Sequence, residues 1–203
     1  LNNDFKNEHV NLDTSNTKFK IIEGDFLKQD IPTFFNKKQV AVIGNYPYNI
    51  SSQIIFKAIE NREYIPELSG MFQKEVADRI ISEFNNSKYG RLSILSSWKL
   101  NIKKIIDIKP QSFSPRPKVD SSLLLFTPKE NFFELKDPKN LEKITRIFFS
   151  QRRKMLKKPF NQVFTNGKEV AKKFGIDLNL RPQNLEPETY FKLVKEYEDL
   201  IRG

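Results

Sequence analysis

The sequence contains no cysteine and a single histidine, His9. Because it has no cysteine, the chain forms no disulfide, has no thiolate nucleophile and offers no cysteine ligands to zinc or an iron–sulfur cluster. A single histidine also argues against a histidine-built metal site and against a serine–histidine catalytic pair. We interpret His9, which lies in a polar stretch, as a solvated residue. We therefore expect no metal.

Long hydrophobic runs are missing as well. We find no apolar run long enough to cross a membrane and no signal peptide, and we therefore expect a cytoplasmic protein. Positive charge is in excess, since 35 Lys and Arg stand against 25 Asp and Glu, which gives a formal net charge of +10. This excess favours a polyanionic partner, either nucleic acid or an anionic membrane surface.

Short apolar runs alternate with amphipathic segments over roughly the first two thirds of the chain. Residues 40–44 are typical of a strand buried on both faces, because the run is continuous and rich in β-branched residues. The other expected strands are residues 19–22, 68–72, 92–98 and 121–126. Helices are expected over residues 52–60 and 74–84. Such alternation implies a mostly parallel sheet with helices on both faces.

The periodicity changes near residue 130. Beyond it the pattern is helical only, in segments near residues 141–157, 168–174 and 187–201. We therefore predict an α/β domain over residues 1–129 and a small all-helical domain over residues 130–203.

The tetrapeptide Asn45-Tyr46-Pro47-Tyr48 directly follows the buried strand. Ligands of open α/β sheets bind at the carboxyl ends of strands. One chemistry that this tetrapeptide suits is activation of the N6 amino group of adenine, which is a poor nucleophile. The Asn oxygen and a backbone carbonyl can accept both amino hydrogens and make the nitrogen more tetrahedral. Proline would hold the neighbouring carbonyl rigid, and tyrosine offers a face for an extruded base. The alternative is an ordinary turn rich in Asn and Pro.

Residues 45–50, Asn-Tyr-Pro-Tyr-Asn-Ile, resemble the N-x-P-Y-x-I motif of the ribosomal RNA adenine N6,N6-dimethyltransferases, the KsgA/RsmA family. Further stretches resemble motifs of this family in the same order and cover nearly the whole chain from Phe19 onward. They are residues 24–27 (G-D-x-L), 72–79 (Q-K-E-V-A-x-R at its core), 89–93, 113–121 (F-x-P-x-P-K-V-x-S), 151–156 and 181–188.

The resemblance implies a Rossmann-like, class I S-adenosylmethionine-dependent methyltransferase. Such an enzyme would transfer methyl groups to N6 of adenosines in 16S rRNA. In-line methyl transfer needs positioning more than a strong base, which suits a chain without cysteine or clustered histidine. The resemblance assigns cofactor binding to Asp25, Phe26 and Asn45. It assigns catalysis to Asn45, Pro47, Tyr48 and Phe113, with Phe113 stacking on the target base opposite Tyr48.

Two features of the family are not found. The family opens with a strand and a G-x-G-x-x-type loop, followed by a second strand that ends in an acid, whereas the seven glycines here include no G-x-G. We expect the first strands of the sheet, roughly 50–70 residues judged from one βαβ unit and its lead-in, to be missing before Leu1. Tyr46 occupies a variable slot that is often Leu in the family.

A stripe of cations is expected on the helix over residues 141–157. On a helical wheel, Lys143, Arg146, Arg153, Lys154 and Lys157 oppose the apolar side chains of Leu141, Ile144, Phe148 and Met155. No acid interrupts residues 143–158, so the stripe suggests a surface that follows RNA phosphates. We add Lys118 to these RNA contacts. Arg152 falls on the apolar side, where it would brace the two domains or pair with a buried carboxylate.

The expected partner is the small ribosomal subunit with its 16S rRNA. We expect a monomer and no membrane partner. One alternative is an Erm-type enzyme that methylates 23S rRNA, although residues 113–121 and 181–188 look more like the first group. Another is a ribosome-assembly factor that binds RNA without catalysis.

Overall fold

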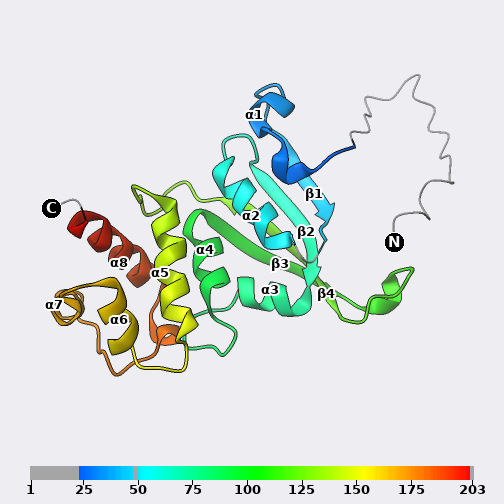
Figure 1. Cartoon of the computed structure of the whole chain (residues 1–203). Helices are drawn as coiled ribbons and strands as arrows, with labels where there is room; N and C mark the ends of the chain where they lie inside the picture. Colours follow the sequence, from blue (N-terminus) through cyan, green and yellow to red (C-terminus); the bar gives the residue numbers. More distant parts are fainter. Residues whose placement is uncertain (1–22, 48–49, 202–203) are drawn as a thin grey trace, which may run out of the picture.

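The computed structural model of the chain describes residues 23–47 and 50–201 (Figure 1). Its centre is a four-stranded sheet in the order β1-β2-β4-β3. The strands are β1 (Ala41–Asn45), β2 (Glu67–Gln73), β3 (Leu100–Ile108) and β4 (Ser121–Pro128). Only β1 and β2 pair in parallel among these strands, whereas β4 is antiparallel to β2 and to β3. The prediction of a mostly parallel sheet is therefore wrong for the described strands, because β4 returns antiparallel to β3 after the loop of residues 109–120 and also pairs antiparallel with β2.

The segment 92–98, predicted as a strand, forms the helix α4 (Arg91–Lys99). Its buried residues Ile94, Leu95 and Trp98 follow helical spacing and pack against the C-terminal helices. A short apolar run does not by itself distinguish a buried strand from a buried helix. The sequence pattern did not predict β3, which lies at the edge of the sheet and is largely exposed.

The strands predicted at residues 40–44, 68–72 and 121–126 are present as β1, β2 and β4, within a few residues of their expected bounds. The first predicted helix is α2 (Ser51–Glu60). Helix α3 (Lys74–Ile80) ends four residues earlier than the predicted residue 84. Beyond the helix, Asn85 adopts a positive φ of 67° and its N–H bonds to the carbonyl of Gln183, which directs the chain toward the C-terminal helices. The strand predicted at residues 19–22 lies outside the described residues.

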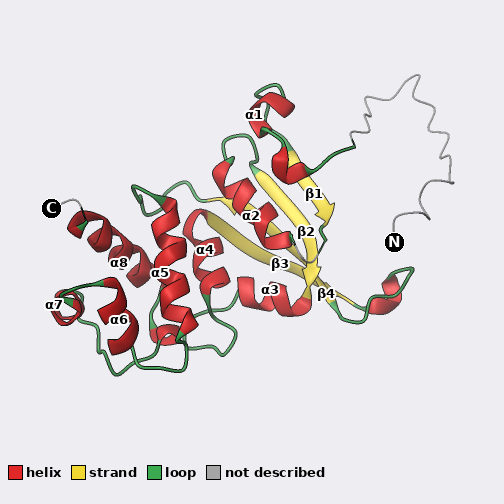
Figure 2. Cartoon of the chain, in the orientation of Figure 1, coloured by secondary structure: helices red, strands yellow, loops and turns green. Residues whose placement is uncertain are grey.

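Helices α2, α3 and α4 lie on one face of the sheet (Figure 2). Leu68 and Phe72 on β2 point to that face and pack with Ile55 of α2 in one apolar core. Within residues 23–47 and 50–201, helices cover this face only, and Ile43, on the opposite face of β1, is 76% exposed. The predicted second helical layer is therefore not part of the described structure.

The C-terminal helices are α5 (Pro138–Ser150), α6 (Lys157–Val163), α7 (Gly167–Lys173) and α8 (Pro187–Leu200). The bounds of α7 and α8 confirm the predicted segments. Their core is aromatic: the ring of Phe148 lies 5.4 Å from that of Phe160 and 5.5 Å from that of Tyr190. Trp98 and Tyr89 join this core from the α/β part.

The helix predicted over residues 141–157 is two helices, α5 and α6, separated by a turn. Pro159 explains the break, because proline has no N–H to continue a helix but is tolerated in a first helical turn, where it lies in α6. The N–H of Leu156 bonds instead to the carbonyl of Leu180, at 2.8 Å. Met155, predicted on the apolar side, is 57% exposed in this turn.

Candidate functional site

The turn after β1 holds the first group of predicted site residues. Asn45 is the last residue of β1 and is exposed, as is Pro47. Tyr46 between them is buried. The carbonyl of Pro47 accepts a 3.1 Å hydrogen bond from the N–H of Ile50, which leads the chain into α2. Tyr48 lies outside the described residues.

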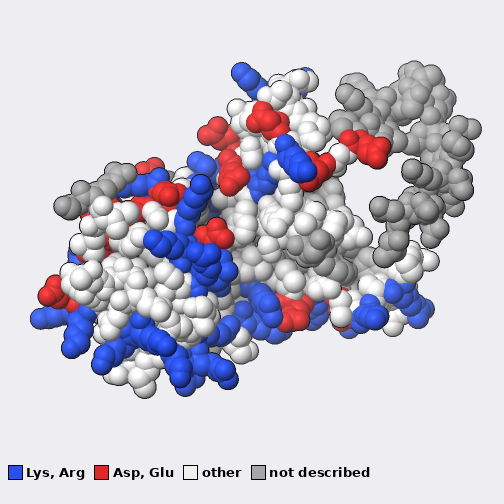
Figure 3. Space-filling view, viewed as in Figure 1, with Lys and Arg blue, Asp and Glu red and all other residues white. Residues whose placement is uncertain are grey.

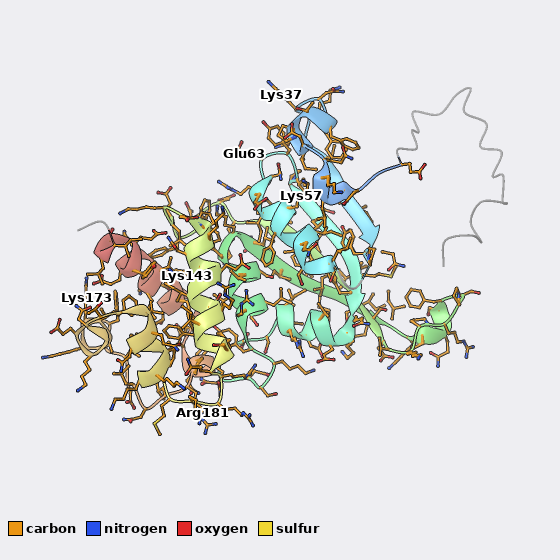
Figure 4. All side chains as sticks on the ribbon, viewed as in Figure 1. Lys37, Lys57, Glu63, Lys143, Lys173 and Arg181 are labelled. Atoms are coloured by element: carbon orange, nitrogen blue, oxygen red, sulfur yellow. The ribbon has the colours of Figure 1, made fainter. Side chains whose placement is uncertain are left out.

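Asp25 and Phe26 form a second turn beside the first. Asp25 begins the 3-10 helix η1 (Phe26–Lys28), and its Oδ1 accepts a 2.9 Å hydrogen bond from the N–H of Leu27. Lys57 of α2 donates to the carbonyl of Leu27 at 2.9 Å, which ties η1 to the helix that follows the Asn45 turn. Figure 4 shows Lys57 at this junction.

A pocket of about 400 Å³ lies between the two turns. Three elements line it: the Asp25 turn with Gly24, Asp25 and Phe26, β1 and its turn with Val42, Ile43, Tyr46 and Pro47, and the start of α2 with Ile50 and Ile54. The structure therefore brings Asp25, Phe26 and Pro47 together, and places Asn45 directly before two lining residues. A pocket of this volume with mostly apolar walls and one carboxylate suits a small ligand with an adenine ring.

Phe113 and Lys118 lie in the loop between β3 and β4. This loop projects from the end of the sheet at which β1 and β2 also end (Figure 1). Its base is closed by Lys109, whose Nζ lies 2.7 Å from Asp120 Oδ2, and by the N–H of Lys74, which donates to the carbonyl of Asp120 at 2.9 Å. Phe113 is half-buried and does not line the pocket, whereas Lys118 is exposed.

Asp107 adds a charged cluster at the same edge of the sheet. Its carboxylate accepts hydrogen bonds from the hydroxyl of Ser122 at 2.6 Å and from Nζ of Lys74 at 2.9 Å. The hydrogen bonds from Ser122 and Lys74 hold the pKa of Asp107 well below its usual range. The base of the Phe113 loop is therefore attached to both β4 and α3.

The predicted RNA-binding residues Arg146, Arg153, Lys154 and Lys157 are all exposed. They do not form a stripe on one helix, because Arg146 is in α5, Arg153 and Lys154 are in the turn and Lys157 begins α6. Figure 3 shows Lys and Arg gathered over this region at the lower left of the molecule. The cations thus share a surface rather than a helical face.

Arg152 has the bracing role expected of it. Its Nη2 donates to the carbonyl of Ser87 and, at 3.4 Å, to that of Asn86. These bonds connect the end of α5 to the loop between α3 and α4.

Membrane-spanning helices and metal-ligand clusters are both absent from the described residues. Among residues 23–47 and 50–201, no helix has the length and apolar character needed to cross a membrane. The same residues contain no group of three or more side chains placed to ligate a metal ion.

The sequence model of the family described as ribosomal RNA adenine dimethylase matches residues 4–199. The chain belongs to this family. It is 76% identical over 187 residues to ribosomal RNA small subunit methyltransferase A of Pelagibacter ubique, covering 91% of this chain and 71% of that protein. It is 37% identical to the protein of the same name from Flavobacterium johnsoniae, covering 94% of this chain and 72% of that protein.

Solved structures agree with the family. A dimethyladenosine transferase from Plasmodium falciparum superposes with a TM-score of 0.70 at 29% identity, covering 88% of this chain and 72% of that one. The 23S rRNA methyltransferase ErmE superposes with a TM-score of 0.61 at 19% identity, covering 88% of this chain and 71% of that one, and shows likeness of fold alone. Members of the family are S-adenosylmethionine-dependent methyltransferases, which confirms the predicted fold class, enzyme class and cofactor.

Sequence reasoning missed the part that Tyr46 plays in this site. It treated Tyr46 as a variable position, whereas the structure buries its ring beneath the turn that carries Asn45 and Pro47. The ring lies on Gly44 and Gly70, which are 26 residues apart in the sequence. No local pattern connects them.

Proposed function

We propose that this chain transfers methyl groups from S-adenosylmethionine to N6 of adenosines in the 16S rRNA of the small ribosomal subunit. The observation that carries this proposal is the shared pocket: the turn of Asn45 and Pro47 at the carboxyl end of β1 faces the turn of Asp25 and Phe26. Cytoplasmic action and a monomeric enzyme belong to the same proposal, as does the division into domains over residues 1–129 and 130–203.

Asp25 and Phe26 would hold the adenine end of the cofactor. The Asp25 carboxylate can accept a hydrogen bond from an exocyclic amino group, and Phe26 supplies an apolar wall beside Ile43 and Ile54. When bound, S-adenosylmethionine supplies an electrophilic methyl group on its sulfonium. The chain's contribution is to hold donor and acceptor in line.

Asn45 would activate the target nitrogen. Its side-chain oxygen and the backbone carbonyl that follows can accept the two N6 hydrogens of an extruded adenine, which turns the nitrogen lone pair out of the ring system. Pro47 restricts the turn, while Tyr48 and Phe113 are assigned to opposite faces of the base. The position of the Phe113 loop at the same end of the sheet supports this assignment.

The rRNA would be held by cations that are exposed in the structure, namely Lys118, Arg146, Arg153, Lys154 and Lys157. Lysine and arginine contacts to phosphates release counterions, so binding should weaken steeply with salt. Lys118 lies at the sheet end that bears the pocket, and the others lie around the α5–α6 turn. One RNA can contact both places while its adenosine reaches the turn of Asn45 and Pro47.

The comparisons favour this function over the alternatives. Both curated relatives described above are named small subunit methyltransferases, whereas the 23S rRNA enzyme is similar in fold only. A binding factor without catalysis would have no need for Asn45 and Pro47 next to a pocket lined by Asp25.

Methylation of small subunits that lack this modification tests the proposal. The full-length protein and methyl-labelled S-adenosylmethionine should give labelled N6-methylated adenosine in 16S rRNA. Label confined to 23S rRNA in parallel reactions with large-subunit substrate would favour the Erm-type function. Tight binding to the small subunit without label would favour a non-catalytic factor.

A further inference from the structure

Tyr46 lies with its ring across two glycines of adjacent strands. Gly44 of β1 and Gly70 of β2 are direct partners in the parallel register. A Cβ placed on Gly44 would lie 2.5 Å from Cε1 of Tyr46, and a Cβ on Gly70 would lie 2.0 Å from its Cε2. Contacts this short are not tolerated between carbon atoms. The two glycines therefore form a slot on the sheet, the Gly44–Gly70 slot, that the ring occupies.

The ring is also held at its tip and edge. The Tyr46 hydroxyl donates a 2.9 Å hydrogen bond to the carbonyl of Ser69, and the ring packs edge-on against Phe72 with centroids 5.7 Å apart. Only 8% of the residue is exposed, and burial raises the pKa of the Tyr46 hydroxyl well above its ordinary value. The hydroxyl thus stays a donor at any working pH.

The consequences fall on the residues either side of Tyr46. Asn45 and Pro47 are exposed, and Asn45 stands at the last pair of the β1–β2 register, opposite Met71. Tyr46 connects them covalently, so the seating of its ring fixes where the backbone leaves β1 and where both neighbours stand. Catalysis that depends on orientation is sensitive to displacements of about 0.5 Å.

We propose that Tyr46, seated in the Gly44–Gly70 slot, is the positioning residue that sets Asn45 for methyl transfer. The inference rests on the proposed function and concerns how the site is built. It assigns a role to Gly70, which lies outside the pocket and outside the turn. It also predicts that residues 46 and 70 are coupled, since the space allowed to one depends on the size of the other.

The test compares single-turnover methylation by full-length protein carrying Gly70→Ala, Tyr46→Phe, or Gly70→Ala with Tyr46→Leu. Gly70→Ala should lower the rate at saturating cofactor and subunit about tenfold or more, while the KM for the subunit stays within about twofold, because the RNA contacts lie elsewhere. Tyr46→Phe keeps the ring and loses one hydrogen bond, so a loss of roughly three- to tenfold is expected. The double variant should recover most of the activity that Gly70→Ala removes.

Gly90→Ala is the matched control. A Cβ at Gly90 would meet no atom closer than 3.8 Å, so this variant should keep the wild-type rate. Normal rates per folded molecule in Gly70→Ala or Tyr46→Phe would overturn the inference, as would a double variant no faster than Gly70→Ala. If Gly70→Ala does not fold, Tyr46→Phe decides alone. A wild-type protein that does not methylate small subunits would overturn the proposed function itself, which is a different result.

Discussion

Glu198 and Asp137 meet where α8 packs on the start of α5: Glu198 Oε1 accepts a 2.9 Å hydrogen bond from the backbone N–H of Asp137. Its Oε2 accepts another, also 2.9 Å, from the N–H of Lys136. The side-chain amide of Asn140 donates to Oε1 at 3.1 Å. Glu198 is only 2% exposed, so this carboxylate joins the segment before α5 to the last helix.

Replacing Glu198 with Gln should destabilise the protein in a pH-dependent way. Burial acts to raise the pKa of Glu198, but the hydrogen bonds from Asp137, Asn140 and Lys136 outweigh it and lower the pKa. A lowered folded-state pKa gives stability that is present above the unfolded pKa, about 4.3, and lost as the pH falls through the folded value. We expect a deficit of about 1–3 kcal/mol at pH 7 that shrinks below about pH 4.

Urea unfolding of both proteins from pH 7 to pH 3 measures this deficit. The control is Asp199→Asn, which removes a surface ion pair with Lys136 (Asp199 side chain 52% exposed) and should leave the free energy of unfolding nearly unchanged. A Glu198→Gln deficit that is the same at every pH would contradict the assigned cause.

Asn45→Ala should separate catalysis from binding. If the Asn45 oxygen accepts a hydrogen bond from the target N6 amino group mainly in the transition state, removing it should lower the methylation rate about a hundredfold. This corresponds to roughly 3 kcal/mol of transition-state stabilisation. Affinity for the small subunit should change less than about twofold. Single-turnover assays on folded protein measure the rate, with Asn101→Ala, an exposed Asn on β3, as control. An active, normally folded Asn45→Ala enzyme would refute the assigned role.

Phe113→Ala tests whether the β3–β4 loop supplies a stacking face. Loss of a base-stacking ring should cost about 1–3 kcal/mol in kcat/KM, whereas Phe113→Tyr should be mild. The same contrast is expected for Tyr48→Ala and Tyr48→Phe. A fall in melting temperature without a fall in activity per folded molecule would show that Phe113 serves packing instead.

Replacing Arg153, Lys154 and Lys157 together by Ala should weaken subunit binding and its salt dependence. Each cation that pairs with a phosphate contributes about 0.7–0.9 to the slope of log K against log salt, so we expect the slope to decrease by about two units. Filter binding at several salt concentrations gives the slope. Lys37→Ala with Lys38→Ala, at the far end of the molecule just after the short helix α1 (Ile31–Phe34), is the charge-removing control (Figure 4). Equal slopes for wild type and the triple variant would leave these cations as ordinary solvated charges.

Local sequence predicted the elements whose signals are local. The continuous β-branched run gave β1, and the spacing of Ile54, Ile55, Ala58 and Ile59 gave α2, because each depends on neighbours within one or two turns. The prediction of a strand at residues 92–98 was wrong because the packing partners of this segment are the C-terminal helices, far along the chain. The break between α5 and α6 could have been read from Pro159, but the bond from Leu156 to Leu180 could not.

The sequence by itself determined the chemical inventory of the site: the motif at Asn45, the acid at Asp25, the absence of cysteine and the excess of positive charge. Tertiary structure alone decided that Asp25 and Pro47 line one pocket and that the cations spread over two helices and a turn. It alone decided that Gly70 receives the ring of Tyr46. The physical reason is that strand pairing sets which distant residues become neighbours, and the register of β1 on β2 places Gly44 opposite Gly70.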